Sequence, residues 1–264
     1  MKTTEIKVLK RPELKNPIFI EGLPGVGYIG RNAAGYMIDT LKAEKFAEIH
    51  SFHFPPVAML RSDKSGKMDS LKNEFYFCKA KNKEKNDLII LIGDAQSMDP
   101  IGHYEIAKEI IEFIKEFKPK EIITLGGFAT GKLDSKTQKV FGAATSDKMI
   151  KRFEKEGIIF KDTNIGQIIG ASGLIVLEAD KYEMNAVCLM GETSGMLLSD
   201  PKATESVLEF LAKYLNIKID MSKIEEKVKE TSDVIKKIEV LQKKLTSQIM
   251  PKTSKNEENL GYIG

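Results

Sequence analysis

The chain has 264 residues, of which 42% are hydrophobic and 30% are charged, as in an ordinary globular protein. Its 41 basic and 38 acidic residues nearly balance, which argues against a protein that binds nucleic acid. No apolar run approaches the roughly 20 residues of a membrane span, and the polar first residues do not resemble a signal peptide. We therefore expect a cytoplasmic protein with neither a nucleic-acid partner nor a membrane partner.

Apolar runs alternate with amphipathic stretches along the first 215 residues. Strands are expected at 4–9, 17–21, 45–54, 57–61, 74–80, 87–93, 121–127, 140–145 and 186–190. Helices are expected at 28–41, through Ile106 to Phe117, at 146–156 and from Asp200 onward, whereas 166–180 fits either type and 62–73 a loop or hairpin tip. A strand, helix and strand in succession form a βαβ unit. The pattern predicts a single three-layer α/β domain with a mostly parallel or mixed sheet.

A glycine-rich turn, GLPGVGYIG, follows the second predicted strand at residues 22–30. Gly25, Gly27 and Gly30 match the dinucleotide-binding pattern G-x-G-x-x-G between a strand and a helix. The acidic residue that should end the next parallel strand of such a site has no clear counterpart here. The turn could hold a ligand, or it could be a close-packed corner where glycine lets two backbones approach.

Other motifs for chemistry are incomplete. The stretch GGFATGKL at 126–133 nearly matches a phosphate-binding loop, but Leu133 stands where a hydroxyl should ligate Mg²⁺. His50 and His53 are three residues apart in a predicted strand and so face opposite sides. No cluster of Cys, His and carboxylate residues has the spacing of a metal site. We therefore expect no catalytic residue, no cofactor and no metal.

Polar residues gather at the predicted strand ends, namely Glu21, Asp94, Gln96, Glu192 and Thr193. In a parallel sheet these positions share the rim where ligands bind. Asp94 and Glu192 could instead cap turns, and a rim lined by glycine could also be a subunit contact. If the rim binds a ligand, the protein is a nucleoside- or nucleotide-binding enzyme or sensor. The candidate residues of this alternative are Gly25, Gly27, Gly30, Asp94 and Glu192.

The composition changes after about residue 220, because 222–248 has no glycine or proline and is rich in Lys and Glu. Apolar residues spaced four and three apart resemble a coiled-coil seam. We expect a core at 1–220, an amphipathic helix at 221–250 and a flexible tail at 251–264. Little of the remaining chain is available to cover this seam, so a contact with another subunit or a partner is favoured over a solvated surface helix. The apolar residues at the C-terminus favour a docking tag over a random tail. The expected contact residues are Ile224, Val228, Ile235, Ile238, Leu245, Leu260, Tyr262 and Ile263.

Several segments together resemble the archaeal members of the proteasome assembly chaperone family. The matching segments are EGLPGVGYIG at 21–30, LIGDAQ at 91–96, GG at 126–127, GASG at 170–173, and GETSG at 191–195 followed by Asp200-Pro201. They span about residues 15 to 215 in the order of the family. Each is weak alone, and their order and spacing make the resemblance specific.

The resemblance implies an α/β fold similar to nucleoside phosphorylases and no demonstrated enzymatic role. It also implies a homo-oligomer, or a complex with a paralogue, that holds proteasome α subunits during assembly of the 20S core particle. The expected function is therefore that of a non-enzymatic, ATP-independent assembly chaperone, with the C-terminal helix and tail as the capture element. Family members often end in a hydrophobic-Tyr-any-residue tail that enters pockets between α subunits. Here Tyr262 stands third from the end, which departs from that pattern.

Overall fold

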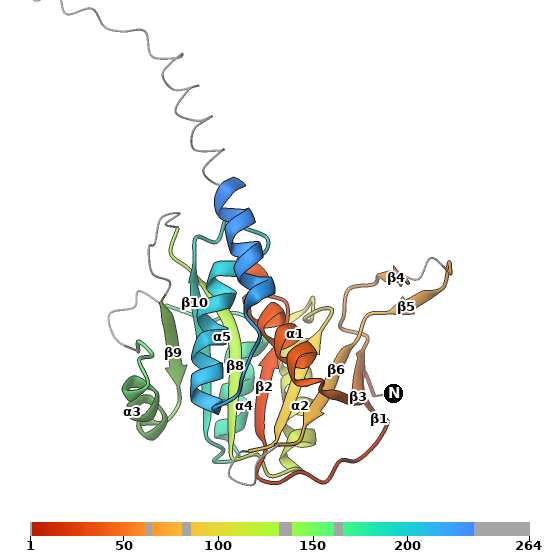
Figure 1. The fold of residues 1–264 in the computed structure, drawn as a ribbon. Coiled ribbons are helices and arrows are strands. Elements are labelled where there is room, and N and C mark those ends of the chain that lie inside the picture. Colours follow the sequence, from red (N-terminus) through yellow and green to blue (C-terminus); the bar gives the residue numbers. More distant parts are fainter. Residues whose placement is uncertain (1, 62–64, 81–85, 132–138, 161–165, 235–264) are drawn as a thin grey trace, which may run out of the picture.

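A mixed eight-stranded sheet lies between two layers of helices (Figure 1). This computed structural model describes residues 2–61, 65–80, 86–131, 139–160 and 166–234. The strands of the sheet are β1 (Thr4–Val8), β2 (Ile18–Gly22), β3 (Glu44–Ser51), β6 (Asn73–Cys78), β7 (Leu88–Gly93), β8 (Glu121–Ala129), β9 (Val140–Ala144) and β10 (Ala186–Thr193). Their order is β1-β3-β6-β7-β2-β8-β10-β9. The predicted three-layer α/β domain with a mixed sheet is confirmed.

The centre of the sheet is parallel and its edges are antiparallel. Strands β7, β2, β8 and β10 run parallel, whereas β1, β3 and β6 on one side and β9 on the other add antiparallel neighbours. Every residue of β2 is buried, as expected for a strand covered on both faces. The predicted βαβ unit at 87–127 does give two parallel strands, but β2 lies between them.

Each face of the sheet has its own apolar core. One core packs the sheet against α1 (Ile29–Leu41), α3 (Asp147–Lys155) and α5 (Pro201–Leu215). The other core packs it against α2 (Pro100–Lys115) and α4 (Ala171–Asp180). The segment 166–180, which the sequence left open between helix and strand, is therefore helical from Ala171 to Asp180. None of the described helices is both long and apolar enough to cross a membrane.

Side-chain caps fix where three of the helices begin. The carboxylate of Asp99 accepts a hydrogen bond from the Gly102 amide at the start of α2, and the Ser146 hydroxyl caps α3. Asp200 accepts the amide of Ala203 at 3.0 Å and stands before a proline at the first position of α5. These contacts satisfy amide groups that have no partner inside the helix. The predicted helix start at Asp200 is confirmed.

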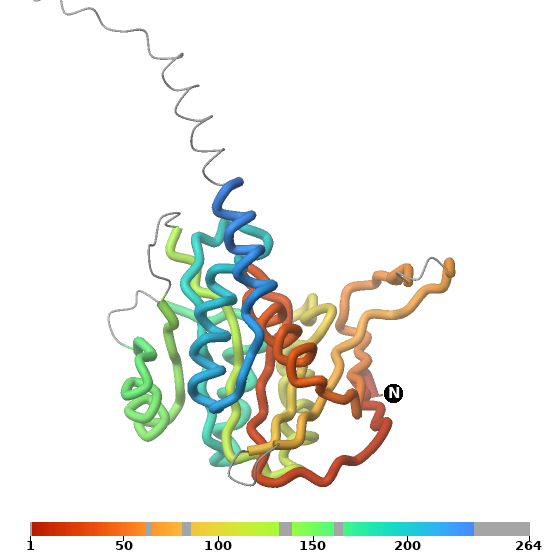
Figure 2. The backbone as a smooth tube through the Cα atoms, viewed as in Figure 1, coloured from red at the N-terminus to blue at the C-terminus, as the bar shows by residue number. Residues whose placement is uncertain are grey.

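A two-stranded hairpin projects from the body on the side of β3 and β6 (Figures 1 and 2). It consists of β4 (Ala58–Leu60) and β5 (Met68–Ser70), which pair with each other and with no other strand of the described chain. The sequence predicted a strand at 57–61 but assigned 62–73 to a loop or hairpin tip. The second strand of the hairpin lies inside that segment.

The chain is helical again over residues 222–234, beside α1 (Figure 1). Ile224 is buried and Val228 is half-buried against the core that also contains α1 and α5. These two residues therefore cover the protein's own core, contrary to the expectation that they face a partner. The other expected contact residues, Ile235, Ile238, Leu245, Leu260, Tyr262 and Ile263, lie outside the described residues.

Candidate functional site

The glycine turn reverses the backbone direction at the carboxyl end of β2. A 3₁₀ turn, η1 (Val26–Tyr28), joins the strand to α1, and Gly27 and Tyr28 have φ values of 63° and 51°. Residues other than glycine seldom adopt this left-handed backbone conformation. The carbonyl of Gly27 accepts a hydrogen bond of 2.8 Å from the amide of Asp200. The turn is thus tied to the start of α5.

Protein backbone fills the space that the glycines leave free. A Cβ atom added to Gly22 would lie 2.2 Å from the carbonyl oxygen of Gly30, and one added to Gly30 would lie 2.4 Å from that of Leu125. A Cβ atom on Gly127 would lie 2.5 Å from the carbonyl oxygen of Val26. These glycines let α1 and its turn pack directly on β2 and β8. The interpretation of the turn as a close-packed corner is supported at each of these positions.

The five residues proposed for a nucleotide site do not line a common pocket among the described residues. A Cβ atom added to Gly25 would have no neighbour closer than the Gln96 amide nitrogen at 4.0 Å, whereas Glu192 is buried and accepts a hydrogen bond from the Lys139 amide. Asp94 lines a polar hollow of about 200 Å³ to which the other four candidates do not contribute. The geometry therefore gives no common ligand site to these residues.

Two other rim residues act as ties between elements. The side-chain amide of Gln96 donates to the Pro24 carbonyl at 2.6 Å, and its oxygen accepts from the Ala171 amide at 2.9 Å. Gln96 thus connects the glycine turn to the first residue of α4. The hydroxyl of Thr193 donates to the carboxylate of Asp200 at 2.6 Å, which holds the end of β10 against α5. Sequence patterns placed both residues at the rim but not these bonds, which depend on tertiary structure.

A row of polar side chains crosses the centre of the sheet beneath α4. Glu21 on β2 pairs in register with Thr124 on β8, which pairs with Cys188 on β10. Residues in register on neighbouring strands point to the same face. The Thr124 hydroxyl donates to the carbonyl of Ser172 in α4 at 2.8 Å. One oxygen of the fully buried Glu21 accepts the Leu23 amide, and the other has no hydrogen-bond partner among the described residues.

Burial controls the protonation of this row. Burial raises the pKa of Glu21 to about 7. Hydrogen bonds to the Glu21 carboxylate, of which that from the Leu23 amide has the largest effect, partly offset this rise. Burial also raises the pKa of the Cys188 thiol to about 12, with a small contribution from the charge of Glu21. A thiol that stays protonated at neutral pH is a poor nucleophile and a poor metal ligand. Cys188 therefore behaves as a buried apolar residue.

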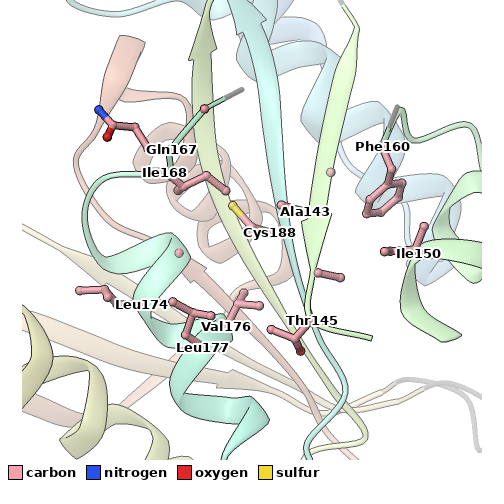
Figure 3. A pocket seen from close by; sticks show the side chains of 14 residues that line it. Ala143, Thr145, Ile150, Phe160, Gln167, Ile168, Leu174, Val176, Leu177 and Cys188 are labelled. Atoms are coloured by element: carbon pink, nitrogen blue, oxygen red, sulfur yellow. The ribbon is translucent and has the colours of Figure 1, made fainter. Parts of the chain in front are cut away.

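An apolar cavity of about 490 Å³ opens at the Cys188 end of this row. Figure 3 shows Val176 and Leu177 of α4 on one side, Ile150 and Phe160 on the other, and Cys188 between them. The few polar groups at its wall include the side chains of Thr145 and Gln167. Such walls suit an apolar group, and the described residues that line the cavity include no charged side chain that could anchor a nucleotide phosphate. None of the residues proposed from the glycine motif lines this cavity.

A second polar cluster joins the end of β3 to the start of α2. His53 contacts Asp99 through Nδ1 at 2.7 Å and Glu105 through Nε2 at 3.5 Å. The hydrogen bond to Asp99, followed by the charge of both carboxylates, raises the pKa of His53 despite burial. The Ser97 hydroxyl donates to the carbonyl oxygen of Asp99 and not to the imidazole, so the cluster is a clamp between elements. Neither this cluster nor any other group of three or more His, Cys, Asp or Glu residues within the described ranges is arranged so that it could hold a metal ion.

The comparisons with known proteins agree with this architecture. The model of the PAC2 family matches residues 19–239, so the chain belongs to the PAC2 family. An uncharacterized protein of Methanocaldococcus jannaschii is 38% identical over 258 residues, which are 98% of this chain and 96% of that protein. This extent covers both cores and both layers of helices.

Two crystal structures from Pyrococcus furiosus are also similar over nearly the whole chain. PbaB, described as an archaeal proteasome activator, is 38% identical with a TM-score of 0.84 over 90% of this chain and 100% of PbaB. PbaA, described as an archaeal homolog of proteasome-assembly chaperone, is 28% identical with a TM-score of 0.73 over 94% of this chain and 96% of PbaA. The expected resemblance to Pba-type proteins is confirmed.

Proposed function

We propose that this protein is a non-enzymatic, ATP-independent assembly chaperone that binds proteasome α subunits. The observation that carries the proposal is the similarity over at least 90% of the chain to PbaB and PbaA, both described by their relation to the proteasome. The packing of the glycine corner and the protonated Cys188 thiol support a role without catalysis. Cytoplasmic localisation and assembly into a homo-oligomer or a complex with a paralogue belong to the same proposal.

The segment 235–264 is the proposed capture element. Helix 222–234 runs antiparallel to α1 in Figure 1, and the amine of Lys227 lies over the ring of Tyr36. Its last described residue therefore lies at the end of the body where the glycine turn and the carboxyl ends of β2 and β8 are found (Figure 1). Thirty further residues continue from this end, and the last of them read LGYIG. The apolar residues of this segment are the proposed contact with the partner.

Affinity capture from native lysate of the source organism tests this proposal. The full chain should retain proteasome α subunits, identified by mass spectrometry. A chain that ends at residue 234 should retain none and should keep its melting temperature, because Ile224 and Val228 remain in place. A full-length control with residues 235–264 in scrambled order keeps length and charge and should also fail. Absence of proteasome subunits from the full-chain capture, or equal capture by the shortened chain, would contradict the proposal.

A second candidate role is activation of the assembled core particle. The TM-score is higher for PbaB, described as a proteasome activator, than for PbaA, at 0.84 against 0.73. The two roles differ in their target, which is a free α subunit for assembly and the finished particle for activation. Addition of the full chain to purified core particles should increase peptide hydrolysis if the protein is an activator. An unchanged rate, together with capture of free α subunits, would assign the protein to assembly alone.

A further inference from the structure

Glu21 is an acidic residue enclosed in the core without a cation beside it. Its side chain has no exposed surface, and one of its two carboxylate oxygens has no hydrogen-bond partner among the described residues. The groups that lower its pKa are all uncharged, namely the Leu23 amide, the Ser172 hydroxyl and the backbone of Leu125. A buried carboxylate without a positive partner is so unfavourable that it either holds a proton or gains contact with water.

The elements packed around Glu21 supply no opposite charge among the described residues. On β7 the residue in register with it is a leucine, and on β8 it is Thr124. Cys188 on β10 follows Thr124 in the same row, and its thiol stays protonated at neutral pH because burial raises the pKa to about 12. The buried residues of α2 are apolar or glycine, and the buried carboxylate of Glu178 on α4 already binds Lys181 at 2.5 Å. Ionisation of Glu21 therefore leaves its charge uncompensated as long as the core stays closed.

The first turn of α4, residues 170–174, covers Glu21 and is attached to the body by side-chain hydrogen bonds. The Thr124 hydroxyl donates to the Ser172 carbonyl at 2.8 Å, and the side-chain oxygen of Gln96 accepts from the Ala171 amide at 2.9 Å. Strands β2 and β8, in contrast, are interior strands with a paired neighbour on each side. A helix end held by a few side chains opens locally at a lower free energy than such strands. We therefore expect this turn to move more readily than the strands that enclose Glu21.

The Ser172 hydroxyl links the charge of Glu21 to the position of this turn. Its single proton is donated to the Leu125 carbonyl on β8 at 3.1 Å. A carboxylate is a stronger acceptor than a carbonyl, and the hydroxyl lies close enough to Glu21 to lower its pKa. An ionised Glu21 therefore competes for this proton and weakens the attachment at Leu125. Gly170, with a φ of 97°, and Gly173 provide backbone freedom on either side of Ser172.

We infer that Glu21 is a proton-controlled latch for the first turn of α4. With the proton in place, the turn stays closed on the sheet. When the proton passes to solvent, the turn moves away from the sheet and water reaches the carboxylate. The pKa of Glu21, at about 7, places this change near neutral pH.

The same movement changes the apolar cavity, because Gly173 and Leu174 form part of its wall beside Cys188. Opening of the turn therefore gives solvent access to the Cys188 thiol. The latch is a property of the isolated chain and needs no proteasome, so its test is independent of the proposed function.

Hydrogen exchange of the purified full chain, followed by mass spectrometry, tests the latch. After correction for the intrinsic exchange rate, the protection of residues 170–174 should fall about 50-fold between about pH 5 and about pH 8. Glu21→Gln has no proton to lose at this position, so its protection should stay constant. Glu48→Gln is the matched control, because the pKa of Glu48 is lowered to about 2 and its carboxyl is ionised throughout this range. This variant should behave as wild type.

The amides of strand β7 distinguish local opening from global unfolding. They should remain more strongly protected than residues 170–174 at both pH values, because the latch opens the turn without separating the strands. Equal protection of the two segments would mean that exchange requires global unfolding, and it would overturn the inference. Protection of the wild-type turn that does not change with pH, or an equal fall in Glu21→Gln, would also overturn it.

Thiol labelling gives a second readout in a Cys78→Ser background, where Cys188 is the remaining cysteine. At about pH 8, N-ethylmaleimide should modify Cys188 at least about tenfold faster in the chain with Glu21 than in Glu21→Gln. Both chains carry the same thiol, so the ratio reports how often the turn is open. Equal labelling rates would contradict the latch.

Discussion

Gly22 and Gly25 stand in the same turn but have opposite surroundings. A Cβ atom on Gly22 would overlap the carbonyl oxygen of Gly30 and would lie 2.6 Å from the Cβ atom of Ala34. Gly25 has extended backbone, and a Cβ atom added to it would come no closer than 4.0 Å to a neighbouring atom, the amide nitrogen of Gln96. The first glycine is therefore needed for packing, whereas the second could be replaced without a clash.

Gly22→Ala should lower the free energy of unfolding by about 1–3 kcal/mol, the usual cost of overpacking a close contact. Gly25→Ala is the matched control and should change it by less than about 0.5 kcal/mol. Urea unfolding followed by circular dichroism measures both. Equal stability of the two variants would show that the corner is not close-packed at Gly22.

Glu21 makes stability depend on pH in an unusual direction. Its folded pKa, at about 7, lies above the ordinary value of 4.5. Between these two values the folded state holds a proton that the unfolded state has lost. Its contribution to stability is therefore fully present below pH 4.5 and is lost as the pH rises through 7.

Glu21→Gln should remove this dependence and gain up to about 3 kcal/mol relative to wild type between pH 4.5 and 8. Glu48→Gln is the control of opposite sign, because hydrogen bonding from Lys45 and then Lys72 lowers the pKa of Glu48 to about 2. The stability that Glu48 contributes is present above pH 4.5 and lost as the pH falls towards 2. Chemical unfolding between about pH 2 and pH 8 measures both variants. A stability difference between Glu21→Gln and wild type that does not change with pH would refute the raised pKa of Glu21.

Residue types at the rim were predictable from sequence, but their partners were not. Glu21, Gln96 and Thr193 were predicted at strand ends. The structure has Glu21 as the penultimate residue of β2, Thr193 as the last residue of β10 and Gln96 three residues after the end of β7. Their bonds, such as that of Gln96 to Ala171, join residues far apart in the chain. The burial of Glu21 depends on α4 lying above it. No local pattern carries that information.

Among the elements, helix 222–234 differs most from its expected role. Its periodicity predicts a seam for a partner, but the first two seam residues pack on the protein's own core. Sequence periodicity identifies an apolar face and not what covers it. The helix therefore belongs to the fold of the core in its described part.

Ile224→Ala should lower the free energy of unfolding by about 2–4 kcal/mol, because Ile224 is 1% exposed. Val234→Ala provides the comparison within the same helix, since Val234 is 54% exposed, and it should cost less than about 0.5 kcal/mol. Thermal and urea unfolding of the full chain measure both. A negligible effect of Ile224→Ala would mean that the helix does not contribute to the core in solution.

The hairpin of β4 and β5 shows where the prediction of secondary structure failed. Its second strand, Met68–Ser70, has three residues in a polar context, too few for an alternating pattern to stand out. The glycine at position 66, with a φ of 73°, provides the turn between the strands, and it was visible in the sequence as a hairpin signal. The long buried strands and the capped helices were predictable because their patterns extend over many residues.

At the scale of the whole molecule, composition and alternation of elements predicted the fold class but not the order of the strands. Strand β2 enters between β7 and β8, which are consecutive parallel strands in the chain. The position of β2 depends on contacts between residues far apart in the chain, because it is determined by which apolar faces pack against each other. Membership of the PAC2 family then links this body to proteins with a proteasome role, a connection that the packing alone does not provide.

The most direct test of the proposed function is the affinity of the purified full chain for purified proteasome α subunits, measured by isothermal titration calorimetry. We expect saturable binding that weakens at least about tenfold when residues 235–264 are removed, with the melting temperature of the shortened chain unchanged. Absence of binding by the well-folded full chain, or an affinity that is the same without residues 235–264, would contradict it.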